Sequence, residues 1–273
     1  MFRCAHKFAQ IRPPGDSRMT GDEAIAALHL PAAARVDRRV PKTLLLEHGA
    51  PTAADKRHIN EGIEQILWVA ALKPTTIGVA AHRDDAREYL EIAVLRAALR
   101  ADAKPPRMIE LLHRAVPYPV LAVTELGNRV NLSLAHKRWS QGEAGKTVLE
   151  GEPVAVDCPR DGDPHGPALV ASLALGRQPR ASLLALYQGW VDVLLALEAA
   201  RRTGRFEIPD VAERRAARRE ALRECARLEA EMARLRAAAA KEQQMPRQVE
   251  LNLELRRAEA ARAAALALLL GTR

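Results

Sequence analysis

Four residues in the first half of the chain have the chemistry of a metal-dependent nuclease centre. Nucleases of the PD-(D/E)xK kind hold Mg²⁺ with clustered carboxylates and keep a lysine beside the attacking water. The residues that could supply these groups are Glu64, Glu91, Glu125 and Lys137. However, no ExK or DxK spacing falls on an expected strand, and the expected element order is not the αβββαβ order of that fold. A nuclease is therefore an alternative function, and no catalytic site is favoured.

Other catalytic and cofactor motifs are incomplete. Residues 142–147 end in Gly-Lys-Thr but lack the first glycine of a phosphate-binding loop, and an expected strand follows them where a helix is required. The three cysteines are far apart, without zinc or disulfide spacing. Asp157, Asp161 and Asp163 do not have the spacing of a calcium loop. We therefore expect no cofactor and no metal, and the sequence favours a protein that is not an enzyme.

Two groups of basic residues could contact an anionic partner. The first is the tip that follows an expected strand, where a tryptophan beside two cations suits a phosphate backbone or an acidic protein; the alternative is that this tryptophan packs beneath the neighbouring linker. The second group lies near the base and the tip of two expected C-terminal helices. Together the candidate contact residues are Lys137, Arg138, Trp139, Arg214, Arg215, Arg218, Arg219, Arg223, Lys241 and Arg247.

The net charge of +8 is unevenly spread along the 273 residues. Residues 201–273 hold 17 Lys/Arg against 11 Asp/Glu. This excess indicates either a solvated, ion-paired helix surface or contact with nucleic acid. Aromatic residues make up only 3% of the chain, which argues against a surface on which bases stack.

The elements that must position these residues form an α+β protein. A capping box at Thr20 and Glu23 opens a short helix, and apolar residues at three- and four-residue steps predict a long helix over 52–72. Strands are expected over 75–79, 89–95, 119–126, 129–135 and 147–156, with a helix over 106–116. Gly127-Asn128 predicts a tight hairpin. The expected order is α-β-β-α-β-β-β, a mixed α/β domain with a small sheet.

The C-terminal part predicts an antiparallel coiled-coil helical hairpin. Apolar residues of 209–242 alternate at steps of four and three, and a second such helix follows Pro246. The expected organisation is a flexible extension (1–18), an α/β domain (19–156), a linker (157–179), a docking helix (180–205) and the hairpin (206–273). Whether translation starts at Met1 or Met19 stays open.

No signal peptide is expected at the N-terminus, because it lacks an apolar core. The apolar stretch 180–200 includes Gln188, Gly189, Asp192 and Glu198, so it predicts a buried helix instead of a membrane span. The expected location is the cytoplasm.

Several separate segments resemble one bacterial family, the domain-of-unknown-function family four-three-nine-one. They are VDRRVPKTLLLEHGAPTAADKRHINEGIEQILWVAALKPTTIGV, EYLEIAVLRAAL, RAVPYPVLAVTE, LSLAHKRW, LYQGW and KEQQMPRQVELNLELRRAE, spread from about Arg35 to Arg262. The resemblance implies no catalytic residues. It does imply a context, because members look like companions of DNA methyltransferases and helicases in restriction-like or phage-defence systems.

These observations lead to three expectations about function. The leading one is a non-catalytic adaptor subunit that contacts a helicase or a DNA methyltransferase, and DNA as a further partner, through the hairpin. The alternative is the nuclease effector described above. A homodimer formed by two hairpins pairing into a four-helix bundle is the third.

Overall fold

The computed structural model describes residues 18–143 and 145–271, which form two compact units with a boundary between Tyr187 and Gln188. The predicted extension 1–18 lies outside the described residues apart from Arg18, which forms an isolated β-bridge with Arg160. The predicted linker 157–179 contains helix α6 (Gly166–Leu173) and a short 3₁₀ helix (Leu175–Arg177).

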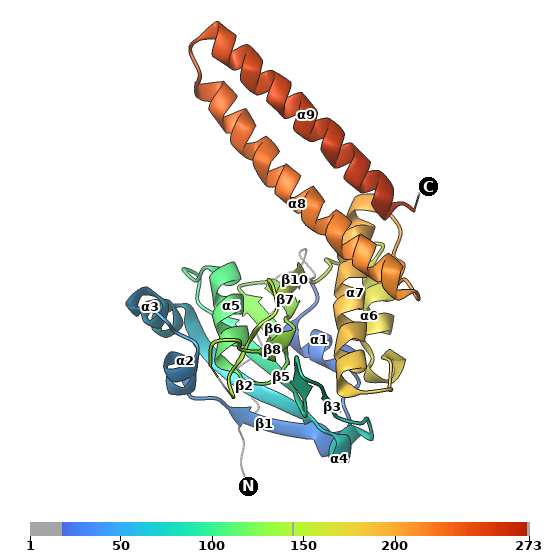
Figure 1. Cartoon of the computed structure of the whole chain (residues 1–273). Coiled ribbons are helices and arrows are strands. Elements are labelled where there is room, and N and C mark those ends of the chain that lie inside the picture. Colours follow the sequence, from blue (N-terminus) through green and yellow to red (C-terminus); the bar gives the residue numbers. More distant parts are fainter. Residues whose placement is uncertain (1–17, 144, 272–273) are drawn as a thin grey trace. The chain divides into compact units, whose positions relative to one another are not determined.

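The first unit is built on a six-stranded mixed sheet in the order β1-β2-β5-β6-β7-β10 (Figure 1). Only β5 and β6 are parallel; every other neighbouring pair is antiparallel. The strands are β1 (Arg35–Arg39), β2 (Ile63–Leu72), β5 (Ile92–Leu99), β6 (Val120–Leu126), β7 (Arg129–Leu134) and β10 (Val154–Asp157). Small two-stranded sheets join β3 (His82–Arg83) to β4 (Glu88–Tyr89) and β8 (Lys137–Trp139) to β9 (Thr147–Leu149).

Two local signals in the sequence are confirmed in detail. Thr20 caps helix α1 (Gly21–Ala27) and exchanges hydrogen bonds with Glu23 in a capping box. Strands β6 and β7 are joined by the two-residue turn at Gly127-Asn128, with Leu126 opposite Arg129. Gly127 has a φ of +59°, a left-handed conformation that glycine adopts without steric cost.

Two expected elements are wrong. The helix expected over 52–72 ends at Gly62: α3 covers Ala53–Gly62 and the strand β2 follows directly. The strand expected over 75–79 is instead the single helical turn α4 (Pro74–Ile77), which begins with proline and ends at Gly78, where φ is +65°. Strand β1, whose arginines give no apolar alternation, was not among the expected strands; it is an exposed edge strand.

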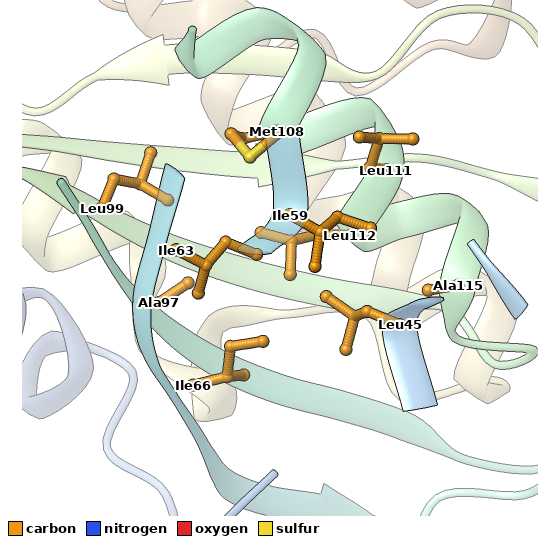
Figure 2. Close-up of a cluster of buried hydrophobic side chains, with 10 residues drawn as sticks. All are labelled: Leu45, Ile59, Ile63, Ile66, Ala97, Leu99, Met108, Leu111, Leu112 and Ala115. Atoms are coloured by element: carbon orange, nitrogen blue, oxygen red, sulfur yellow. The ribbon is translucent and has the colours of Figure 1, made fainter. Parts of the chain in front are cut away.

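One face of the sheet packs against α2 (Lys42–His48), α3 and α5 (Pro105–Ala115). Figure 2 shows this core, in which side chains from all three helices meet those of β2 and β5. Because side chains alternate along a strand, Ala97 and Leu99 of β5 point into this core while Arg96 points to the other face, where α1 contacts β6.

The order of elements around the sheet differs from the expected one. Helix α1 is followed by β1, β2 and β5 as three antiparallel neighbours, and α5 then connects β5 to the parallel strand β6. When α2, α3, α4 and the small β3–β4 sheet are left out, this order is α-β-β-β-α-β. It was missed because β1 was not predicted and β2 was assigned to the preceding helix.

The second unit contains the C-terminal part of α7 (Leu183–Thr203), then α8 (Ala212–Lys241) and α9 (Met245–Leu269). Helices α8 and α9 run side by side in opposite directions and are joined by three residues (Figure 1). All six expected inward residues of α8 are buried: Ala221, Cys225, Leu228, Met232, Leu235 and Ala239. On α9, Leu251, Ala258, Ala265 and Leu269 are buried, while Leu255 and Arg262 are half-buried.

Helix α7 has the length and apolar composition of a membrane-spanning helix. It is the one described helix to which this applies, and 78% of its most apolar window is buried, which is common in the core helices of proteins that do not cross membranes.

Candidate functional site

The four expected nuclease residues do not share one site. Glu91 lies two residues before Ala93, which pairs with Val120 at the start of β6, whereas Glu125 lies five residues further along β6. At 3.3 Å per residue, the two backbones are about 17 Å apart or more, far beyond the roughly 4 Å span of two-metal sites. Among residues 18–143 and 145–271, no three His, Cys, Asp or Glu side chains form a group that could hold a metal ion.

Glu125 belongs to an ion cluster built around the buried Arg96, in which the Asp22 side chain is exposed. The Arg96 guanidinium donates to both carboxylate oxygens of Glu125, at 2.7 and 2.9 Å, and to Asp22 of α1 at 2.6 Å. The Gly21 amide, at the first turn of α1, donates to the same Glu125 carboxylate at 3.1 Å. A Cβ at Gly21 would lie 2.2 Å from Glu125 Oε1, so only glycine permits this close approach.

This cluster places a cation between two carboxylates, but the cation is a guanidinium. Burial lowers the pKa of Arg96, and the bonds to Glu125 and Asp22 outweigh this effect, so that the net pKa is raised. Arg96 is 4% exposed. The arrangement fastens α1 to the sheet, and a metal ion could enter only if Arg96 moved away. Asp22 and Arg96 carried no sequence signal, because the cluster joins residues more than 70 positions apart.

Glu91 is held by Lys73, whose ammonium lies 2.9 Å from the Glu91 carboxylate. The hydrogen bond and the charge of Glu91 raise the pKa of Lys73. The other oxygen of Glu91, Oε1, is buried without a hydrogen-bond partner among the described residues. Glu64, near the start of β2, is exposed.

Lys137 is a buried residue of β8 and not part of an exposed basic tip. Its ammonium donates to the carbonyl oxygens of His113 and Val116 at the C-terminal end of α5. The helix dipole favours a cation at this position, and burial lowers the pKa of Lys137 to about 8. Lys137 therefore fastens β8 to α5.

The rest of the expected tip is also partly buried, which corrects the picture of an exposed patch. His136 is 9% exposed and its Nδ1 lies 2.6 Å from the Tyr89 hydroxyl. Arg138 and Trp139 are half-buried, and the Trp139 amide donates to the Ala86 carbonyl. The sequence showed the cations but could not show that a second small sheet would enclose them.

A cleft of about 1260 Å³ lies between α5, β9 and the strands β7 and β10. Its three arginines are paired with carboxylates: Arg107 and Arg114 with Glu110, and Arg129 with Asp157, each at 2.5 Å. The cleft therefore has cations at its rim whose charge is already compensated.

Several hairpin cations are also engaged within the second unit. Arg215 lies 3.5 Å from the buried Asp192, and it also donates to main-chain carbonyls of the segment before α8. Burial raises the pKa of Asp192, although Gln188 and the nearby arginines oppose this shift. Arg218 donates to the Glu207 carbonyl, while Arg223 and Arg247 pair with neighbouring glutamates on their own helices. Arg214 and Lys241 are exposed, and Arg219 is half-buried.

The comparisons with known proteins give one match. A family model described as Domain of unknown function (DUF4391) matches residues 28–261. The chain belongs to this family. No curated protein and no solved structure matches it. The DUF4391 match starts just after α1 and ends within α9, so the sheet, Arg96, Glu125 and most of both hairpin helices lie inside it.

The surface that sequence reasoning missed is the outward face of α9. Met245, Val249 and Leu253 follow one another at four-residue steps and are 69%, 53% and 53% exposed. The signal that could have found these residues is a second apolar row, opposite the inward one, on the same helix.

Proposed function

We propose that this protein is a non-catalytic adaptor subunit of a bacterial DNA-methyltransferase and helicase system of the restriction-like or phage-defence kind, acting in the cytoplasm. The observation that carries the proposal is the outward face of α9. A solvated helix is normally polar on the side away from its partner, and exposed apolar rows mark contact sites with other proteins. The family resemblance implies neighbouring genes for DNA methyltransferases and helicases. The proposed partner is therefore a helicase or methyltransferase subunit.

The candidate chemistry of the first unit is consistent with this proposal. Arg96, Glu125, Glu91 and Lys137 each form an ion pair or hydrogen bonds that hold elements together. Such groups stabilise a fold, and none of the four lies beside a second reactive group in a metal-binding arrangement.

The hairpin is proposed to be an antiparallel coiled coil. The inward residues alternate at four- and three-residue steps on both helices, and the buried set joins Leu228, Met232 and Leu235 to Leu251 and Ala258. A rigid two-helix arm presents its outward residues at fixed spacing, which suits recognition of another protein. The exposed cations Arg214, Arg223 and Lys241 are the candidates for additional DNA contact.

The test is co-purification of the tagged protein with the products of neighbouring genes, with and without nuclease. We expect a helicase or methyltransferase subunit to co-purify in both cases. Leu253→Glu should abolish the recovery because it places a charge in the apolar row, whereas Ala233→Glu, an exposed position on α8, should not. Failure to recover either kind of subunit would refute the adaptor function.

A metal-dependent nuclease stays the second candidate because the elements follow the order α-β-β-β-α-β once α2, α3, α4 and the β3–β4 sheet are left out, which weakens one objection to it. The Arg96 guanidinium between Glu125 and Asp22 argues against it. Incubation of the purified protein with DNA and Mg²⁺ or Mn²⁺ decides between the two functions. Cleavage that is lost in Glu125→Gln would establish a nuclease. Intact DNA would leave the adaptor proposal.

A further inference from the structure

The outward face of α9 is a single periodic row with one charged member. Its residues recur at steps of three and four from one end of the helix to the other, which places them on one side. The row spans about 33 Å at 1.5 Å per residue. It consists of Met245, Val249, Leu253, Arg256, Ala260, Ala263 and Ala267.

Helix α8 carries only alanines as apolar residues on its outward side (Ala226, Ala230, Ala233 and Ala237), and it has no exposed large apolar residue. Its outward positions include Arg223, Arg227, Arg234 and Lys241, which keep that side solvated. The contrast within one hairpin shows that the apolar row is not a general property of the arm. It indicates that α9 is covered on a second side and α8 is not.

Arg256 is the only charged member of this row. It forms no ion pair or hydrogen bond with any residue that the structure describes, and the nearest acid on the same helix side, Glu259, pairs with Arg236 at 2.9 Å. A cation surrounded by apolar contacts is stabilised only by an opposite charge on whatever covers it.

The position of Arg256 argues against a second copy of this chain covering the outward row of α9. It lies midway between Met245 and Ala267, eleven residues from each. Two copies of α9 that paired antiparallel along the row would therefore bring Arg256 against Arg256 at their centre. Like charges facing each other inside an interface disfavour that pairing.

We propose that the outward row of α9 binds an amphipathic helix of the partner protein, antiparallel or parallel to α9, whose apolar face carries one Asp or Glu opposite Arg256. This proposal rests on the adaptor function and specifies the chemistry of the partner segment. The apolar residues on either side supply the contact area, and the central charge pair sets register and excludes self-association.

The probe is a synthetic peptide of residues 245–267 carrying R256E, because it presents the proposed apolar face with an acid at its centre. The matched control is the same peptide with the native arginine. Fluorescence anisotropy against the full-length protein should show about fivefold or tighter binding of the R256E peptide, the change expected for one partly desolvated charge pair.

Exchanging the charge at position 256 between protein and peptide tests whether Arg256 makes the contact. Full-length Arg256→Glu protein should reverse the preference and bind the native peptide better, whereas Arg257→Glu, one residue on and about 100° round the helix, should leave the preference unchanged. Leu253→Glu protein should bind neither peptide. Circular dichroism of each variant controls for loss of the helices.

Three results would overturn the proposal. Equal binding of both peptides, or binding of neither, would show that Arg256 does not select its partner. A native protein that dimerises by light scattering, with the dimer lost in Leu253→Glu, would make a second copy the occupant. Because no helicase or methyltransferase enters this experiment, its outcome is independent of the co-purification that tests the adaptor function.

Discussion

Lys137 has the surroundings of a lysine that holds a fold together. Lys137 is 2% exposed, and its ammonium donates to two main-chain carbonyls; none of the described carboxylates forms an ion pair with it. Both hydrogen bonds survive deprotonation, because a neutral amine still donates two. The fold therefore tolerates the positive charge of Lys137 but does not require it.

We expect this to appear as a pH dependence of stability. The pKa of Lys137 is about 8 in the folded protein, against 10.5 ordinarily. Between these values the unfolded chain binds the extra proton, so the free energy of unfolding should rise with pH, by at most about 3 kcal/mol. Urea unfolding below pH 8 and near pH 10 should show this rise in the native protein and a smaller one in Lys137→Met. Equal slopes would mean that Lys137 titrates normally.

The Arg96 cluster should be sensitive to loss of one charge. In Glu125→Gln, Arg96 loses the carboxylate that accepts two of its hydrogen bonds, and the Gly21 amide loses a charged acceptor. The free energy of unfolding should fall by about 2 kcal/mol, as for a buried pair that is partly compensated. Glu152→Gln, at an exposed glutamate, is the control in the same denaturation experiment, and a similarly small effect of both changes would contradict the structural role.

Residue types alone showed which side chains could be reactive but not what they do. Glu125 and Lys137 were singled out because a carboxylate and a lysine are nuclease groups, and both turned out to be bonded to structural partners. Their partners, Arg96 in one case and two carbonyls of α5 in the other, lie 20 or more residues away. Such roles depend on tertiary contacts that no local pattern encodes.

At the scale of elements, Glu229 joins three helices of the second unit. Its carboxylate lies 3.2 Å from Arg202 of α7 and 2.9 Å from Arg262 of α9. Arg262 occupies a position of the inward row that is otherwise apolar, so this pair helps to fix the register of α8 against α9.

Removal of this link should cost modest stability with measurable coupling. Glu229→Ala should lower the free energy of unfolding by about 1 kcal/mol, because the side chains are partly exposed. A double-mutant cycle with Arg262→Ala should show less than additive losses. Glu250→Ala, which breaks only a pair on one helix, should change stability little; strict additivity of the first two changes would rule out the coupling.

Elements that carry a local signal in the sequence, such as a cap, a turn or a periodic apolar row, were predictable, and elements without such a signal were not. The capping box at Thr20, the Gly127-Asn128 turn and the inward rows of α8 and α9 each have a local physical cause, and all are found. The prediction of a helix over residues 63–72 failed for a different reason. Apolar residues on both faces of a central strand imitate the spacing of a helix, and only the pairing with β1 and β5 distinguishes them.

At the scale of the whole molecule, the net charge of +8 overstates the free positive surface. Many arginines of the described residues are paired with carboxylates or bonded to carbonyls. We therefore expect any DNA binding to be weak, independent of sequence and lost at moderate salt. Substitution of Arg214, Arg223 and Lys241 by Gln should reduce the slope of log affinity against log salt by up to about 3; an unchanged slope would exclude these cations.

The class of the fold was predictable from composition and turn signals, but the sheet order was not. Pairing between β1, β2 and β5 joins segments separated by loops and helices, and the sequence does not show which strands become neighbours. The resemblance to the family extends over the same elements and carries no activity with it, so the arrangement around Arg96 could come only from the structure.

The order of α8 and α9 along the chain has a consequence during synthesis. The six inward residues of α8 leave the ribosome without their partner, and α9 needs about another 25 residues, a few seconds of translation, to cover them. Until then the nascent chain exposes the apolar inward face of α8. A chain truncated within α9 would leave these inward residues uncovered, and exposed apolar surface of this kind is what chaperones and proteases recognise.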